Sequence, residues 1–287
     1  MNILLLMHFS VFLAGFTGLL GRAISVDSYS IVFWRMLFAV VCYALFVFFF
    51  HPLRHLSRSF ILKSMLVGAT LMVHLVFFYL SIKLSNVSIG VITLSCMGFF
   101  TAMLEPCLFK RNHSYLEIFF SVISIVGIMF IFGFDSRYRL GIGVGLLAAV
   151  ISALFCVGTK VIAAAPDYLT VLFWQLSGGF AALLVFLPFY LYLFGSQDFW
   201  PNPIDWGYLL FLGIFCTTIL YLLVTKLSAF TLALTTNLEP VYSIIMAMII
   251  FDEAQEINFS FYLGLAFIVA SVILQTHRSY KQELKIK

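Results

Sequence analysis

Long apolar runs separated by short polar turns recur along nearly the whole chain, and they limit how it can fold more than any other feature. A helix needs about 20 mostly apolar residues to cross a bilayer core of about 30 Å. Charged residues make up 10% of the 287 residues, against about 25% in a typical water-soluble domain. The sequence therefore predicts an all-α integral membrane protein with ten transmembrane helices. We expect these helices near residues 3–21, 30–50, 60–82, 87–109, 115–133, 141–163, 169–194, 206–226, 231–250 and 260–276.

The lysines and arginines between these runs predict how the chain is oriented. Positively charged loops favour the cytoplasmic side, and a cytoplasmic N-terminus places 11 of these residues on that side and 4 on the other. We therefore predict a multi-pass protein of the cell inner (plasma) membrane with both termini cytoplasmic. No basic segment precedes the first apolar run, which favours a retained helix over a cleaved signal peptide. The cytoplasmic set is Arg54, Arg58, Lys63, Lys110, Arg111, Lys160, Lys226, Arg278, Lys281, Lys285 and Lys287, and the opposite set is Arg22, Lys83, Arg137 and Arg139.

The sequence contains no motif for a cofactor, a metal ion or ATP. Its five cysteines lie inside apolar runs without metal-ligand spacing, so we expect neither a zinc site nor a disulfide framework. A glycine-rich stretch at 141–145 opens a predicted membrane helix and follows no strand, which argues against a dinucleotide-binding loop. Because the basic residues lie in short loops and the tail, we expect the lipid bilayer as a partner and no nucleic acid.

An internal repeat divides the chain in two. Residues 87–131 and 230–274 each form a helix, a charged turn and a second helix, at an offset of 143 residues. Upstream, Phe33-Trp34-Arg35 corresponds to Phe173-Trp174-Gln175. We predict five-helix domains at 1–134 and 140–276, followed by a basic tail at 277–287. Because five is odd, the second domain enters the membrane inverted, and inverted repeats are typical of transporters that work by alternating access.

Several of these residues resemble a known family signature. Leu238-Glu239-Pro240-Val241, with Glu253 thirteen residues after the proline and then Gly264, resembles the EamA family of the drug/metabolite transporter superfamily. Arg35 in FWRMLFA, Gly68 with Phe78-Tyr79, and Thr217 with Tyr221 fit the same pattern. The resemblance implies export or exchange of amino acids or other metabolites. The first repeat departs from it, with Met97 where the family usually has proline and Lys110 where it usually has an acidic residue.

Three ionisable residues inside predicted helices are candidates for a central substrate site, because a charge in the hydrocarbon core usually faces a cavity or a partner. Arg35 can bind a carboxylate or phosphate, or act as a structural cation. Glu239 can bind an ammonium group or a coupling proton, or stay protonated within the bundle. Pro240 removes one helical hydrogen bond and is the predicted hinge. His74 can relay protons, although a lone helical histidine is more often a packed residue.

Aromatic and small polar residues complete the predicted site. Trp34 and Trp174 can line a cavity and stack on a solute, or belong to the aromatic belt at the membrane surface. For Tyr79, close to a helix end, the belt is the favoured interpretation. The full predicted cavity set is Trp34, Arg35, His74, Tyr79, Ser95, Trp174, Gln175, Tyr221, Asn237 and Glu239.

The predicted function is a secondary-active carrier of a small metabolite, such as an amino acid, and not an enzyme. Arg35 and Glu239, in opposite halves, would together bind a zwitterion unless they pair with each other. One alternative is a membrane-embedded enzyme acting on lipids. Against it, only Asp252, Glu253 and Glu256 cluster, and no histidine lies beside them. A second alternative is an uptake carrier for a cationic or nucleotide-like solute, and a third is a channel or scaffold that carries out no transport.

Overall fold

The computed structural model describes residues 3–109, 119, 122–123, 126–127, 129–130, 136–162, 167–219, 229–255 and 258–286. Helix accounts for 88% of the structure, and the described ranges contain no strand, so the all-α prediction is confirmed. The helices are α1 (Ile3–Ala23), α2 (Ser28–Phe50), α3 (Arg58–Leu84), α4 (Val87–Ser95), α5 (Met97–Phe109), α7 (Arg139–Ile162), α8 (Tyr168–Phe194), α9 (Pro203–Gly213), a π-helix (Ile214–Ile219), α11 (Ala229–Ile250) and α12 (Phe259–Ile286), with 3-10 turns at Ser136–Tyr138 and Glu253–Gln255.

Where both are described, the helix boundaries agree with the predicted runs to within a few residues, except that α12 continues from the predicted end at 276 to Ile286, through the segment predicted as a tail. Five spans among the described residues are long and apolar enough to cross a membrane, and shorter apolar helices accompany them. Most of the predicted helix 115–133 and part of 206–226 lie outside the described residues. The protein is therefore a multi-span helical bundle, and the count of ten stays a prediction.

Polar side chains explain where several helices begin. The N-terminal amides of a helix have no partner within the helix, and a preceding Asp, Ser or Asn accepts from one of them. The described residues include six such caps. They are Asp27 before α2, Ser57 before α3, Asn86 before α4, Asp167 before α8, Asn202 before α9 and Asn258 before α12.

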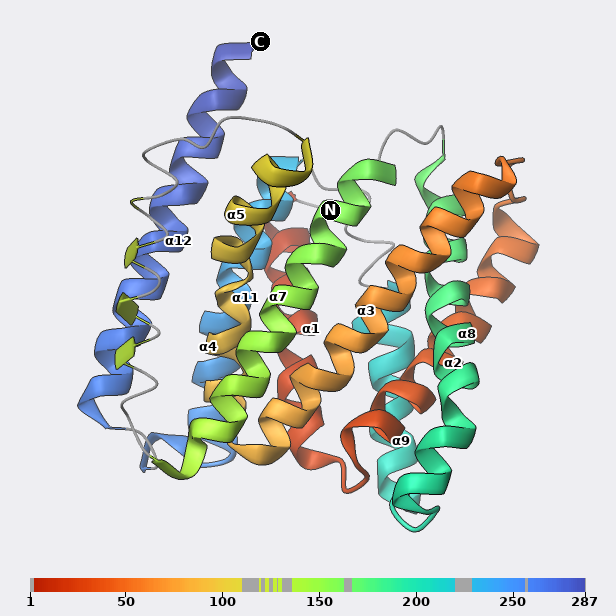
Figure 1. Ribbon diagram of the computed structural model, residues 1–287, viewed down its shortest axis with the longest axis horizontal. Helices are drawn as coiled ribbons and strands as arrows, with labels where there is room; N and C mark the ends of the chain where they lie inside the picture. The colour runs from red at the N-terminus through yellow and green to blue at the C-terminus, as the bar shows by residue number, and fades with distance from the viewer. Residues whose placement is uncertain are drawn as a thin grey trace.

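The two ends of the bundle carry different loops. Figure 1 shows both termini in the upper half of the view, on the side of the loop 51–57. We call this side the proximal end. The opposite side, the distal end, carries the turns 24–27, 195–202 and 251–255 (Figure 1).

Helices α3 and α8, one from each half, cross in direct backbone contact. A Cβ atom added at Gly68 would lie 1.8 Å from the carbonyl oxygen of Gln175, and one at Gly178 would lie 2.3 Å from Cα of Met65. Only glycine allows this approach. The crossing holds the two halves together near the main apolar core.

The fourth predicted helix, 87–109, is interrupted at Cys96, whose backbone stays in the helical region (φ −69°, ψ −6°), and Val87–Glu105 still forms one apolar span. Hydroxyl and thiol groups explain a break without proline, because side chains that bond to the carbonyl four residues back bend helices. Thr93 donates to Ile89 O at 2.8 Å and Ser95 to Val91 O at 3.0 Å, while the Cys96 thiol lies 3.8 Å from Ile92 O. The repeat-related helix α11 continues through Pro240. The interruption therefore lies in the half that lacks the proline.

A π-helix follows α9 without a gap. Thr217 Oγ1 donates to Leu212 O at 2.9 Å, and Thr218 Oγ1 donates to Gly213 O at 3.1 Å. Both bonds reach five residues back, the spacing of the wider turn. Short π-segments occur frequently at functional sites, and this one faces Arg35.

Candidate functional site

Arg35 is the centre of a polar cluster between the two halves. It lies in the second turn of α2, about 10 Å from the helix start, and it is only 5% exposed. Its Nε donates to Thr217 Oγ1 at 2.8 Å, its Nη1 to the Tyr79 hydroxyl at 2.6 Å, and its Nη2 to the Cys216 carbonyl at 3.4 Å. Residues from α2, α3 and the π-helix therefore meet at one buried cation.

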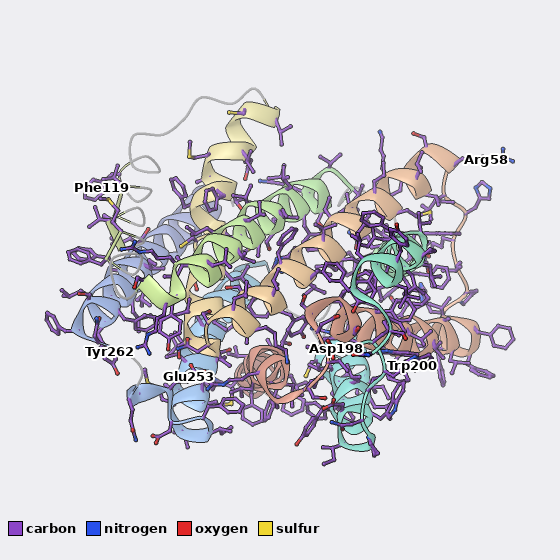
Figure 2. All side chains as sticks on the ribbon, turned by 60° about the horizontal axis from the view of Figure 1, so that its bottom comes forward. Arg58, Phe119, Asp198, Trp200, Glu253 and Tyr262 are labelled. Carbon is purple, nitrogen blue, oxygen red and sulfur yellow. The ribbon has the colours of Figure 1, made fainter. Side chains whose placement is uncertain are left out.

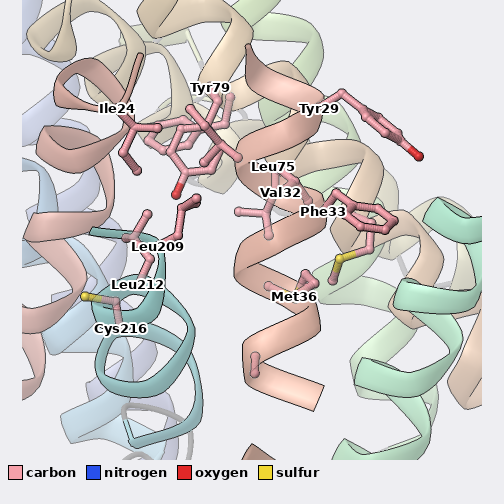
Figure 3. Packing of buried hydrophobic residues seen from close by; sticks show 14 of the residues in the cluster. Ile24, Tyr29, Val32, Phe33, Met36, Leu75, Tyr79, Leu209, Leu212 and Cys216 are labelled. Carbon is pink, nitrogen blue, oxygen red and sulfur yellow. The ribbon is translucent and has the colours of Figure 1, made fainter. Parts of the chain in front are cut away.

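Tyr79 is fully buried, with no exposed surface, so its assignment to the interfacial belt is wrong. The reason is close packing: a Cβ atom added at Gly21 would lie 2.4 Å from the Tyr79 ring, so α1 covers it. Figure 3 shows the hydroxyl directed toward the helix that carries Leu209 and Cys216. Tyr79 thus holds Arg35 and does not contact the membrane surface.

The charge of Arg35 has only neutral hydrogen-bond partners within the described part of the chain. A guanidinium has five N–H donors, and the three bonds above leave two of them, five minus three. Glu239 is close enough for its charge to interact with Arg35 and with Cys216. No ion pair joins Arg35 to Glu239, although both side chains are described. Two N–H groups of Arg35 therefore have no acceptor among the described residues.

Two other predicted site residues form hydrogen bonds within the bundle. His74 is buried in α3, and its Nδ1 donates to Ala148 O of α7 at 3.1 Å. A carbonyl can only accept, so this bond holds the proton on Nδ1. Ser95 donates to a carbonyl of its own helix. Both contacts match the structural interpretation of these residues, although His74 is within electrostatic range of Arg35.

Trp34 belongs to an aromatic cluster at the distal end. Its Nε1 donates to Phe199 O at 2.9 Å, and its ring packs against Trp206, with centroids 4.8 Å apart, and against Trp200. Trp200 is labelled beside this end of α2 in Figure 2. Trp34 therefore ties α2 to the turn 195–202.

The repeat-related pair Trp174 and Gln175 lies in the second turn of α8. Helices α2 and α8 are antiparallel, since Tyr29 bonds to Leu183 O and Tyr43 to Leu169 O. Their second turns consequently lie near opposite ends of the bundle. Trp174 packs on a small proximal cluster, and Gln175 Nε2 donates to Thr159 at 3.5 Å. The structure does not bring this pair together with Trp34 and Arg35.

The remaining predicted residues are covered only in part. Tyr221 lies outside the described residues, and only the backbone of Asn237 is described. Glu239 and Pro240 are partly buried in α11. Among the described residues, no group of three His, Cys, Asp or Glu side chains is arranged to hold a metal ion.

Cys216 is the contact that sequence reasoning missed. Its backbone carbonyl, not its thiol, accepts from Arg35, and backbone contacts leave no signal in residue type. Thr217 was predicted only from its match to the family pattern. The sole local hint was the pair Thr217-Thr218 inside an apolar run, because threonine hydroxyls can bond to helix carbonyls.

Comparison with known proteins places the chain in a family. The profile of the EamA-like transporter family matches residues 1–133 and 139–276. An uncharacterized transporter of Bacillus subtilis (strain 168), YetK, is 30% identical over 135 residues, which is 45% of this chain and 39% of that protein. The match therefore spans well under half the length of that relative.

A solved crystal structure has the same fold. It superposes with a TM-score of 0.61 at 16% identity, covering 95% of this chain and 96% of the other. Identity at that level shows the fold alone. The family match covers both halves of the sequence, and the helices are apolar enough to cross a bilayer. The chain belongs to the EamA-like transporter family, and its apolar helices make it a multi-pass membrane protein.

Proposed function

We propose that this protein is a secondary-active carrier that moves a small carboxylate-bearing metabolite, such as an amino acid, across the inner membrane by alternating access. Export or exchange is the proposed direction, and a coupling proton is the proposed co-substrate. Trp34, Arg35, His74, Tyr79, Ser95, Trp174, Gln175, Tyr221, Asn237 and Glu239 remain the proposed cavity set, with Arg35 as the principal binding group and Pro240 as a hinge.

The observation that carries the proposal is the buried Arg35 cation with neutral partners. Burying an unpaired charge is strongly unfavourable, so such a group is retained where a ligand supplies the opposite charge. Tyr79 and Thr217 hold the guanidinium plane in one orientation. The two remaining N–H groups, one on each terminal nitrogen, can bind a carboxylate as a fork.

Glu239 supports a zwitterion over a simple anion. It lies in the second half, within electrostatic range of Arg35, and can bind the ammonium group while Arg35 binds the carboxylate. A purely cationic solute would be repelled by Arg35. Two opposite charges at one site also give selectivity, because a ligand missing either group leaves a buried charge unpaired.

Inverted repeats support alternating access. Helices α2 and α8 occupy the same place in the two halves and run antiparallel. Such halves can exchange conformations and so expose one site to each side in turn. We propose the domain limits 1–134 and 140–276, a basic cytoplasmic tail at 277–287, and cytoplasmic termini. This places the proximal end inside and the distal end outside.

Exchange in proteoliposomes tests the proposal. Vesicles loaded with one unlabelled amino acid take up the labelled form by counterflow, and a thermal-shift screen of amino acids, nucleosides, sugar phosphates and quaternary amines selects the solute. A ligand that binds only the folded protein raises its melting temperature. For the selected solute, Arg35→Lys should weaken binding about tenfold or more, because lysine keeps the charge and loses the fork.

A matched control separates the site from general charge loss. Arg139→Gln removes an arginine at the exposed start of α7 and should exchange at the wild-type rate. Glu239→Gln should weaken binding of zwitterions more than binding of the same acids without an amino group. Wild-type exchange by both Arg35→Ala and Glu239→Gln would remove the proposed site, and saturable binding of quaternary amines alone would favour the cation carrier.

A further inference from the structure

Glu253 is a completely buried carboxylate at the distal end of the bundle. It lies in the 3-10 turn between α11 and α12 and has no exposed surface. Figure 2 labels it at the end of the bundle, beside the second-half helices. It forms an ion pair with Arg22 in the last turn of α1. A buried carboxylate in a connecting turn requires strong partners, and Arg22 is the first of them.

The second set of partners is the N-terminus of α4. Val87 N donates to Glu253 Oε1 at 2.8 Å, Ser88 N donates to Oε2 at 2.8 Å, and the Ser88 hydroxyl donates to Oε2 at 2.6 Å. The next amide, of Ile89, bonds to the Asn86 side chain, and Gly90 N begins the regular helical pattern with Asn86 O. The open amides of Val87, Ser88 and Ile89 are therefore all satisfied. Glu253 supplies two of these bonds from 165 residues away.

A carboxylate in this place also complements the helix dipole, which is positive at the N-terminus. Arg22 adds a second interaction, since its guanidinium lies 4.9 Å from the ring centre of Phe251. Glu253 and Phe251 thus hold the end of α1 and the start of α4 against the second half. One carboxylate thus joins the last turn of α1, the start of α4 and the turn Glu253–Gln255.

The element that Glu253 holds is short and has a break at its other end. Helix α4 ends at Ser95, and the chain turns at Cys96 before α5 begins. Along its length α4 packs on α1 through Gly18 and on α3 through Gly90. A nine-residue helix with a break at one end and a carboxylate clamp at the other can pivot when the clamp is released.

The repeat-related position in the first half carries the opposite charge. The offset of 143 residues relates Glu253 to Lys110, and it relates the start of α4 at Val87 to Phe230, one residue after the start of α11. A lysine cannot accept hydrogen bonds from helix amides, and its charge is unfavourable at a helix N-terminus. The sequence repeat therefore does not carry the carboxylate over to position 110, which lies outside the described residues.

We propose that Glu253 is a latch that keeps the distal end closed at rest, and that substrate export requires its release from α4. With Glu253 bound to Arg22 and to the start of α4, the resting carrier is closed at the distal end. This inference rests on the proposed function for its meaning in transport. The latch itself affects only the equilibrium between the conformation that is closed at the distal end and the one that is open there.

Hydrogen exchange of the full-length protein in lipid nanodiscs tests the latch without any substrate. Glu253→Gln removes the charge and one acceptor. Exchange of the amides at 87–90 should rise about tenfold or more, because local opening sets the exchange rate, while amides in α3 and α8 keep the wild-type rate. Asp252→Asn is the matched control: it neutralises the adjacent exposed carboxylate, and asparagine tolerates the positive φ of 58° found there.

A second variant tests the latch from the side of α4. Ser88→Ala removes the hydroxyl that donates to Glu253 Oε2 at 2.6 Å, so exchange of the amides at 87–90 should rise, by less than in Glu253→Gln. Unchanged exchange at 87–90 in Glu253→Gln, or an equal rise throughout the bundle, would overturn the latch. A larger rise in Ser88→Ala than in Glu253→Gln would show that the carboxylate is not the group that holds α4. If the hydrogen-exchange results agree with the latch but the protein exchanges no substrate, only the proposed function is contradicted.

Discussion

Arg35 determines the chemistry of the candidate site because its charge is permanent. Neutral partners orient a guanidinium without cancelling its charge, and Tyr79, Thr217 and the Cys216 carbonyl all act in this way. An acid in the same place could be neutralised by a proton, whereas arginine stays charged at any physiological pH. The residue therefore favours an anionic group in every conformation that keeps it buried.

Removing the Tyr79 hydroxyl should destabilise the protein through Arg35. Tyr79→Phe deletes the 2.6 Å bond and leaves a buried N–H of a cation without its acceptor. Hydrogen bonds to charged groups contribute about 1.5–3 kcal/mol in water-soluble proteins and less between membrane helices, so we expect a loss of about 1–2 kcal/mol. The melting temperature in detergent measures it.

Tyr192→Phe serves as the control for this change. Tyr192 is 86% exposed, and its substitution should leave the melting temperature unaltered. Equal melting temperatures for Tyr79→Phe and wild type would show that the hydroxyl does not support Arg35. A substrate, once identified, should bind more weakly to Tyr79→Phe because the fork is less well oriented.

Asp167, the cap of α8 at the proximal end, should make stability depend on acid pH. Burial raises the pKa of Asp167, but hydrogen bonds from Thr170 and His51 outweigh it, so the pKa lies below the ordinary 3.8. A carboxyl whose pKa is lowered by folding stabilises the protein above the unfolded-state value and loses that effect as pH falls through the folded-state value.

The variant Asp167→Asn lacks the titrating carboxyl, so its stability should not show this dependence on pH. Asparagine still caps a helix, so the variant should be less stable than wild type by only about 1 kcal/mol at pH 7. That difference should persist down to about pH 4 and shrink as pH falls further, through the folded-state pKa of Asp167. Melting curves across this range measure it, and a difference that stays constant with pH would contradict the assignment. Asp252→Asn should keep the wild-type pH profile.

Residue-level contacts were only partly predictable from sequence. Arg35 was identified because a charge inside an apolar run is conspicuous. Its partners are 44, 181 and 182 residues away, and no local pattern encodes such distances. Tyr79 was assigned wrongly because its distance from a helix end does not reveal that α1 covers its ring.

At the level of elements, the crossing of α3 and α8 is the most constrained contact between the halves. The Gly68 Cα and the Gln175 carbonyl leave no room for a side chain, and a Cβ atom added at Gly179 would lie 2.8 Å from the carbonyl oxygen of Gly68. Contacts between backbones cannot adjust through side-chain rotamers. Any enlargement must therefore separate the two helices.

Gly68→Ala should consequently destabilise the protein severely. Its new Cβ would lie 1.8 Å from a backbone oxygen, and overpacking of this kind costs about 3 kcal/mol or more. Gly143→Ala is the matched control, because a Cβ there has no neighbour within 4 Å. Melting temperature and yield of folded protein measure both. Equal stability of the two variants would contradict the crossing.

Hydropathy identified the elements well, because the length of a spanning helix follows from bilayer thickness. The interruptions were not predicted. Pro240 indicated a hinge, yet the break lies at Cys96, where thiol and hydroxyl groups compete for helix carbonyls. The π-helix likewise depends on threonine hydroxyls and tertiary contacts. Such residues are common in ordinary membrane helices, so their presence alone does not locate a break.

For the whole molecule, the arrangement of the loops makes a prediction about sidedness. The termini and the loop 51–57 lie toward one end, and the turns 195–202 and 251–255 lie toward the other (Figure 1). The excess of basic residues in the sequence segments predicted for this end predicts that it faces the cytoplasm. The predicted even number of crossings is consistent with both termini lying on that side.

Reporter fusions check the sidedness. Green fluorescent protein fused after Lys287 should fluoresce, because it folds in the cytoplasm. Alkaline phosphatase inserted after Ser196, in the distal turn, should be active, because it requires the oxidising exterior. Insertion of the phosphatase after Leu53, in the proximal loop, should give no activity. The reverse pattern would place the Glu253 latch inside the cell and reverse the proposed resting state.

A fixed cation at the proposed site also affects ions that the protein does not carry. If solute passes Arg35, then sodium and potassium ions following the same route approach a positive charge in a region of low dielectric constant. That electrostatic barrier resembles the one by which water channels exclude cations. A carrier built in this way can change conformation repeatedly without leaking these two ions, so a cell can keep many copies of it with little loss from its sodium and potassium gradients.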